Sequence, residues 1–116
     1  MRVAVVDPRE DFSLLFGLCL ELAGCDVDAY PSGQDFLDTY RPGAADVVIL
    51  QWGMPLMPGW EVEEEMLKRG WTDPVLFMGG EILNWNNPRC IPEEGPMDRT
   101  LQRIRAAAKA AGSLPG

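Results

Sequence analysis

The chain has 116 residues, 47% of them apolar, and a formal net charge of −8, and all eighteen Asp and Glu residues lie at or before Asp98. A domain of this length buries about two-thirds of its unfolded-chain surface, so the composition argues against global disorder, and no apolar run approaches the ~18 residues of a membrane span. The acidic part of the chain, up to Asp98, repels nucleic-acid phosphates, which argues against direct DNA binding. The chain has no histidine, and its three cysteines do not have the spacing of metal ligands, so we expect no zinc site.

The first elements alternate between the patterns of strands and helices. Residues 2–6 are an apolar run that ends at Asp7, which is typical of a fully buried strand. From 12 to 23 the apolar residues recur at steps of three and four, which predicts a helix that ends at Gly24. Residues 25–30 alternate in polarity, as a half-exposed strand does.

The alternation continues through the middle of the chain. Ser32, with Asp35 three residues later, predicts the start of a helix. Residues 46–50 are the most apolar strand pattern, which we expect at the centre of the sheet. A helix pattern at 60–69 and a buried strand at 74–78 follow.

The pattern then breaks. Residues 79–88 contain two glycines, three asparagines and a proline, which disfavours a full helix. A brief edge strand at 89–91 and a terminal helix at 97–111 complete the elements. We therefore expect one domain over residues 1–111, with a flexible tail or linker stump at 112–116.

This order of elements predicts the class of fold. Strands and helices in strict alternation form a parallel sheet with helices on both faces, which is the α/β class. The N-terminus is too short and too soon acidic for a secretory signal, so we expect a cytoplasmic location without membrane contact.

Residues 46–59 (Asp-Val-Val-Ile-Leu-Gln-Trp-Gly-Met-Pro-Leu-Met-Pro-Gly) resemble the centre of a response-regulator receiver domain. In that family a buried strand ends in a phosphate-accepting aspartate, and a loop of the form Met-Pro-x-Met-x-Gly follows. The loop is present from Met54 to Gly59, whereas Gln51 stands at the acceptor position. The resemblance covers nearly the whole chain and implies a flavodoxin-like, doubly wound sheet of five parallel strands in the order 2-1-3-4-5, with the fourth helix shortened or missing.

The resemblance also implies where a phosphorylation site would lie. The family uses an acidic pair that holds a divalent cation, the acceptor aspartate, a hydroxyl after the fourth strand and a lysine after the fifth. The corresponding degenerate pocket consists of Asp7, Pro8, Gln51, Gly79 and Gly95. Its vestigial metal ligands are Asp7, Glu10 and Gly53. We expect no cofactor, weak or absent Mg²⁺ binding, and a hydrogen bond from the Gln51 amide to Asp7.

These substitutions predict an atypical, phosphorylation-independent receiver that is not an enzyme, because an amide cannot replace the nucleophilic carboxylate. Such a pseudo-receiver would act as a signalling protein–protein interaction module. Its partner would be a histidine kinase or another signalling protein docking at the first helix, and a homodimer is left open. The candidate interaction surface consists of Trp52, Met54, Met57 and Trp85.

Other interpretations are left open. A small-molecule sensor would use an apolar pocket rimmed by Trp52, Trp60 and Trp85, with methionines among them. The chain is alternatively the input domain of a longer transcriptional regulator. The basic residues after Asp98 either complement a helix dipole or form a basic face for an acidic partner or a sister subunit.

Overall fold

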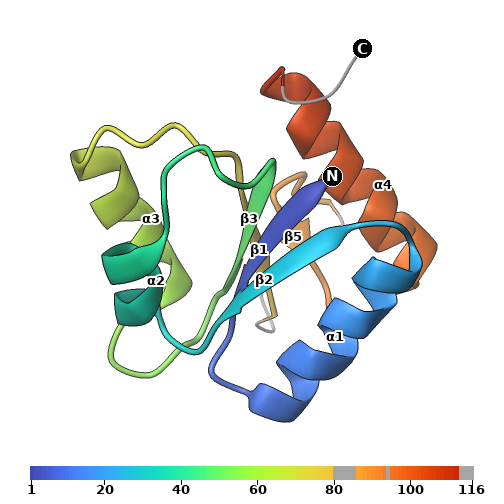
Figure 1. Ribbon diagram of the computed structural model, residues 1–116, viewed down its shortest axis with the longest axis horizontal. Helices are drawn as coiled ribbons and strands as arrows, with labels where there is room; N and C mark the ends of the chain where they lie inside the picture. The colour runs from blue at the N-terminus through green and yellow to red at the C-terminus, as the bar shows by residue number, and fades with distance from the viewer. Residues whose placement is uncertain (80–85, 94, 113–116) are drawn as a thin grey trace.

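The computed structural model describes residues 1–79, 86–93 and 95–112 and contains a single five-stranded sheet flanked by helices (Figure 1). The strands are β1 (Arg2–Val6), β2 (Asp26–Tyr30), β3 (Val47–Gln51), β4 (Val75–Met78) and β5 (Cys90–Ile91). The helices of the described residues are α1 (Glu10–Leu22), α2 (Gly33–Thr39), α3 (Gly59–Lys68) and α4 (Met97–Ala110). All neighbouring strands are parallel, in the order β2-β1-β3-β4-β5, which confirms the predicted fold class.

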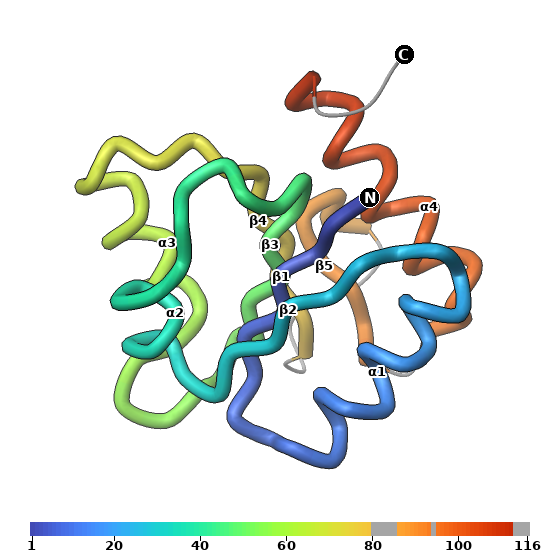
Figure 2. Tube along the Cα trace, viewed as in Figure 1, coloured from blue at the N-terminus to red at the C-terminus, as the bar shows by residue number. Residues whose placement is uncertain are grey.

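The helices cover the two faces of the sheet in pairs. Figures 1 and 2 show α2 and α3 on one side of the sheet and α1 and α4 on the other. Alternate residues of each strand point to opposite faces, so the sheet contributes to two separate cores. On the α1 and α4 side the core includes Val3, Val5, Ile49, Phe16, Leu20, Ile104 and Ala108. On the α2 and α3 side it includes Ala4, Val6, Leu50, Phe36, Leu37, Val62 and Met66.

The local signals in the sequence account for several helix ends. The Ser32 hydroxyl accepts a hydrogen bond from the Asp35 backbone N–H at 3.0 Å, which is the cap that the spacing predicts for α2. Gly24 follows α1 with a φ of 93°, a left-handed conformation that glycine adopts without strain. The predicted boundaries of these helices are therefore confirmed within one or two residues.

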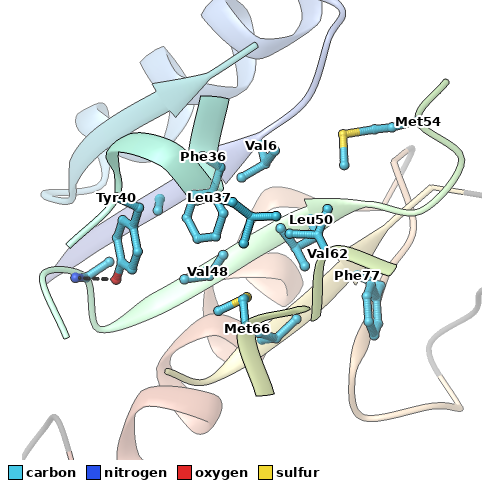
Figure 3. Close-up of a cluster of buried hydrophobic side chains, with 13 residues drawn as sticks. Val6, Phe36, Leu37, Tyr40, Val48, Leu50, Met54, Val62, Met66 and Phe77 are labelled. Atoms are coloured by element: carbon cyan, nitrogen blue, oxygen red, sulfur yellow. Dashed lines mark hydrogen bonds between the residues drawn. The ribbon is translucent and has the colours of Figure 1, made fainter. Parts of the chain in front are cut away.

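Tyr40 ties α2 to the edge of the sheet opposite the strand carboxyl ends. Its ring stacks on Phe36 with a centroid distance of 4.6 Å, as Figure 3 shows beside Leu37. Its hydroxyl donates to Asp73 Oδ2 at 2.7 Å and accepts from the Ala45 backbone N–H at 2.9 Å. A phenol that is buried with both a donor and an acceptor partner stabilises the fold without leaving an unpaired polar group.

Some predictions fall on other parts of the chain. Residues 80–85, where the fourth helix was expected to be shortened or missing, lie outside the described residues, as does most of the predicted tail. Within the described ranges, no helix has the length and apolar character needed to cross a membrane.

Candidate functional site

The carboxyl ends of the parallel strands bring the predicted pocket residues to one edge of the sheet. Asp7 follows β1, Gln51 ends β3 and Gly79 follows β4. Two residues beyond β5, the side chain of Glu93 reaches this group: a methyl group built on Gly79 would lie 2.6 Å from Glu93 Oε1 and 3.3 Å from Gln51 Nε2. The site therefore combines residues at the carboxyl ends of four different strands.

Arg9 binds the buried carboxylate of Asp7. Asp7 is 3% exposed. Its Oδ1 accepts from the Arg9 backbone N–H at 2.9 Å and from Arg9 Nε at 3.0 Å, while its Oδ2 accepts from Arg9 Nη2 at 2.7 Å. A guanidinium that donates to both carboxylate oxygens forms the strongest class of protein hydrogen bond. The carboxylate of Asp7 is therefore already paired with a cation, the guanidinium of Arg9.

The same guanidinium also binds Glu93. Arg9 Nη2 lies 2.6 Å from Glu93 Oε1, and the guanidinium carbon lies 4.2 Å from the centroid of the Phe12 ring. The hydrogen bond to Asp7, and after it the bond to Glu93, raises the pKa of Arg9 above its ordinary value. Arg9 therefore stays charged and bridges two carboxylates. We call Asp7, Arg9 and Glu93 the arginine clamp.

The local sequence positions Arg9. Asp7 accepts from the backbone N–H two residues later, which is the turn that short acidic side chains form with their own backbone. Arg9 then has extended φ and ψ of −83° and 97° as the residue before α1. The acids in the first turn of α1, Glu10 and Asp11, suit the positive end of the helix dipole. Arg9 is consequently fixed at the junction of β1 and α1, beside Asp7.

The structure corrects one predicted contact and shows where the other predicted residues lie. The Asp7 carboxylate accepts from Arg9, and no hydrogen bond joins it to Gln51, so the predicted amide–carboxylate bond is wrong. Pro8, Glu10 and Gly53 are exposed. Gly95 lies in a turn in which its N–H donates to the Pro92 carbonyl at 3.2 Å. Among the described residues no group of three or more His, Cys, Asp and Glu is arranged to hold a metal ion.

Sequence reasoning missed Arg9 and Glu93. The available signal was a pair of opposite charges: Arg9 lies two positions after Asp7, and Glu93 lies two positions after β5. Both positions follow parallel strands at the same sheet edge, so opposite charges there have the opportunity to pair.

The predicted interaction surface is only partly exposed. Met54 is 5% exposed and belongs to the core on the α2 and α3 side (Figure 3), so it cannot contribute to a contact surface. Its side chain turns inward because the loop after β3 folds back onto that core. Trp52 packs edge-on against Phe77 at 5.1 Å, Met57 is half-buried, and Trp85 lies outside the described residues.

Of the tryptophans predicted to rim an apolar pocket, Trp52 and Trp60 belong to the described residues, whereas Trp85 lies outside them. The indole of Trp52 is half-buried against the core, and Trp60 is exposed on α3. A cavity of about 520 Å³ lies instead between α1 and β2, and Leu14, Leu18 and Tyr30 are among its lining residues. Trp52, Met54 and Met57 thus pack against the core on the α2 and α3 side, and the small-molecule pocket stays a prediction.

Comparison with known proteins gives the family context of this arrangement. Residues 3–91 match the profile of the response regulator receiver domain. The chain is similar to the transcriptional regulatory protein PcoR of Escherichia coli, with 26% identity over 77 residues. These residues cover 66% of this chain and 34% of that protein. It is also similar to ethylene receptor 2 of Arabidopsis thaliana, with 34% identity over 77 residues that cover 61% of this chain and 10% of the receptor. The chain thus spans about a third and a tenth of these relatives.

Solved structures resemble the whole fold. The receiver domain of the Francisella response regulator 1452 has a TM-score of 0.78 at 17% identity, covering 95% of this chain and 98% of that one. A response regulator receiver domain protein from Clostridium thermocellum has a TM-score of 0.80 at 18% identity, covering 96% of each chain. At these identities the structural likeness shows the fold, while the match over residues 3–91 shows the family.

Proposed function

Because the chain belongs to the response regulator receiver domain family of two-component signalling, we propose that it is an atypical member that works without phosphorylation. In this proposal the domain is not an enzyme. It presents one fixed surface to a histidine kinase or another signalling protein. The relatives it matches are longer, so we include in the proposal that it serves as the input domain of a larger regulator.

The arginine clamp is the observation that carries this proposal. Phosphoryl transfer in a receiver requires a divalent cation on the acidic group after the first strand, because the transferred phosphoryl group carries spread negative charge. Here the Arg9 guanidinium occupies both oxygens of Asp7. A metal ion would have to displace this guanidinium before it could reach the buried carboxylate of Asp7. Mg²⁺ commonly uses one or two carboxylates together with phosphate oxygens.

The remaining positions support the same conclusion. Gln51 has an amide where a nucleophilic carboxylate would be needed. Gly79 has no hydroxyl to offer a phosphoryl oxygen. Glu93, whose carboxylate stands beside Gly79, would repel a phosphoryl group, whereas the family's lysine after the fifth strand attracts one. Several independent requirements of the chemistry are missing at once.

The clamp also supports a fixed conformation. It joins the β1–α1 turn to the loop after β5, since Arg9 and Glu93 belong to those two segments. In a switchable receiver these loops respond to the phosphoryl group. Here the two carboxylates are already bound by one arginine side chain of the same chain. The proposed module is therefore permanently in one state, and its regulation comes from its abundance or from competition between partners.

The test is the response of the wild-type chain to Mg²⁺ with beryllofluoride, which mimics a phosphoryl group on an aspartate. We expect the melting midpoint and the mass from light scattering to be the same with and without these additions. The variant Gln51→Glu, which restores a carboxylate but not the rest of the site, serves as the matched control and should also be unresponsive. A rise of the wild-type midpoint on addition of Mg²⁺ and beryllofluoride would show that a working site exists and would overturn the proposal.

A further inference from the structure

A groove lies between α1 and the edge strand β2. Its volume is about 520 Å³, and Leu14, Leu18, Val27 and Ala29 are among the residues that line it. Leu14 and Leu18 are 65% and 48% exposed, and Ala29 is exposed as well. Apolar side chains gathered around an open hollow mark a place where another molecule can bury them. We call this hollow the α1–β2 groove.

Gly17 keeps the floor of the groove low. It is a buried residue in the middle of α1, and it lines the groove. Inside a helix glycine is the least favourable residue after proline, whereas alanine is the most favourable. A methyl group on Gly17 would have Val27 Cγ1 as its nearest atom, at 3.6 Å, which is an ordinary van der Waals contact. Alanine would therefore fit here, and the effect of the glycine is to leave space for a side chain from outside.

The strand β2 offers backbone groups beside the same groove. It is the outermost strand of the sheet and pairs on one side with β1 (Figures 1 and 2). The Asp26 N–H donates to the Met1 carbonyl at 2.9 Å, so the backbone of Asp26 faces β1. Because backbone directions alternate along a strand, the N–H and C=O groups of Val27 and Ala29 point away from β1. Backbone groups at a sheet edge are a template on which an extended peptide can add as a strand.

Acidic side chains stand at both ends of the groove. Glu10 in the first turn of α1 and Glu21 in the last both line it, and both are exposed. Its described lining residues include no lysine or arginine. Eleven residues separate the two glutamates, which corresponds to about 16 Å along the helix and is close to the length of a five-residue strand. The groove therefore complements an apolar segment that carries a positive charge at each end.

A second copy of the chain is a poorer occupant. Pairing two β2 strands edge to edge would bring Asp26 and Asp28 close to the same residues of the second copy, and like charges across a strand pair are destabilising. A small cationic amphiphile would match the charges but would leave the backbone groups of Val27 and Ala29 unused. An extended peptide makes use of the hollow, the strand edge and the two glutamates together.

We propose that the α1–β2 groove binds an extended segment of a protein partner, which adds to the sheet as a further strand beside β2. The segment is apolar where it faces the groove and carries lysine or arginine at both ends. This inference deepens the proposed function and rests on it for the partner's being a protein. Its test uses neither Mg²⁺ nor beryllofluoride, so the two proposals fail separately.

A capped heptapeptide, Lys-Thr-Val-Thr-Leu-Thr-Lys, is the probe. Alternate side chains of a strand share one face, so both lysines and both apolar residues face the groove, with about 20 Å between the two end residues. We expect the peptide to bind with a Kd below about 1 mM, the weak end of specific association. It should shift the amide NMR signals of Val27 and Ala29. The same peptide with glutamate in place of both lysines should not bind.

Charge variants test the ends of the groove. The double variant Glu10→Lys with Glu21→Lys should weaken binding of the peptide at least about tenfold. Its matched control is Glu61→Lys with Glu64→Lys on α3, which makes the same change of net charge and should leave the affinity unchanged. Circular dichroism of each variant verifies that it is folded.

Two further variants test the floor and the strand edge. Gly17→Ala should raise the melting midpoint and yet weaken the peptide, because the methyl group favours the helix and fills the floor of the groove. Ala29→Pro removes an N–H that points away from β1. Proline is tolerated on an edge strand in that orientation, so the fold should survive while strand addition is lost.

Several results would overturn the proposal. One is a wild-type chain that leaves the peptide unbound at about 1 mM. Another is binding that the double variant Glu10→Lys with Glu21→Lys does not weaken, or NMR shifts centred on α3. A wild-type chain with twice the monomer mass in light scattering that does not bind the peptide would assign the edge of β2 to a second copy. If Ala29→Pro does not fold, the charge variants still decide.

Discussion

Arg9 Nη2 lies 2.6 Å from Glu93 Oε1, although 84 residues separate the two along the chain. The same nitrogen lies 2.7 Å from Asp7 Oδ2, so one guanidinium bridges two carboxylates at the same edge of the sheet. Two carboxylates brought together without a cation would repel each other. In this chain the side chain of Arg9 supplies that cation.

Replacing Arg9 by methionine should destabilise the fold and create a response to divalent cations. The change keeps an apolar stem but leaves the buried carboxylate of Asp7 without its partner. Breaking a fully buried ion pair costs about 3–5 kcal/mol, and since the Arg9 side chain is 40% exposed we expect about 2 kcal/mol in urea unfolding. Because Mg²⁺ would bind the folded state alone, it should restore part of the lost stability in this variant.

The control for that experiment is Arg2→Met. Arg2 pairs with Asp28 at 3.0 Å, with about half of each side chain exposed, so its loss should cost less than about 1 kcal/mol and create no response to Mg²⁺. An Arg9→Met protein as stable as the wild type, or one whose stability ignores Mg²⁺, would contradict the view that the guanidinium stands in for a metal ion.

Gly79→Ala should destabilise the protein by about 1–2 kcal/mol, because Gly79 has a φ of 84°, a left-handed conformation that is strained for a residue with a side chain. The new methyl group would also lie 2.6 Å from Glu93 Oε1. That oxygen is at the far end of a flexible side chain, so the contact should add little. The measurement is thermal unfolding of Gly79→Ala in the wild-type and Glu93→Ala backgrounds. A loss that disappears when Glu93 is removed would show that the contact, and not the backbone, sets the cost.

Gly59→Ala, at the first residue of α3, should be more damaging than Gly53→Ala in the loop that precedes this helix, and the two variants form a matched pair. A methyl group on Gly59 would lie 2.6 Å from the Gln51 carbonyl oxygen, a backbone atom that cannot move aside. We expect a loss of about 1–3 kcal/mol, as in overpacked cores. Gly53 has no atom within 4 Å of such a methyl group, so its variant should lie within about 0.5 kcal/mol of the wild type. Equal effects in denaturant unfolding would contradict the described path of this loop.

Tyr40→Phe should cost about 1–3 kcal/mol at neutral pH, because the Ala45 N–H would lose its buried acceptor. Burial, together with the hydrogen bond to Asp73, raises the pKa of Tyr40 above its ordinary value of about 10. Above that pH the unfolded chain loses the phenolic proton while the folded chain keeps it, so wild-type stability should fall as the pH rises. Urea unfolding between about pH 9 and 11 should show a flatter dependence for the variant, and parallel curves would contradict this assignment.

The amino-acid sequence predicted the fold closely because its signals are local. A buried strand shows in the apolar run at 46–50, and a helix start shows in Ser32 with Asp35, whose hydrogen bond the structure contains. Such patterns depend on neighbours a few residues apart. The glutamine at position 51, directly after this apolar run, can likewise be read from the chain itself.

The candidate site was less accessible to sequence reasoning. Met54 belongs to a motif that looks like an exposed loop, yet its side chain enters the core, since the loop's direction depends on the packing of α2 and α3. Gln51 was expected to pair with Asp7, but Arg9 is a stronger partner because it offers charge and two donors. Several polar groups could bind a buried carboxylate, and which one does so depends on their positions in three dimensions. The order of residues along the chain does not give these positions.

The sequence by itself thus determined that the chain is a receiver-type α/β domain, since propensity, periodicity and a short motif are written in consecutive residues. Only the tertiary structure decided that Arg9 and Glu93 meet. A parallel sheet gathers the ends of strands from distant parts of the chain at one edge. The ion pair between Arg9 and Glu93 joins two loops that are far apart in sequence, so no local sequence pattern predicts it.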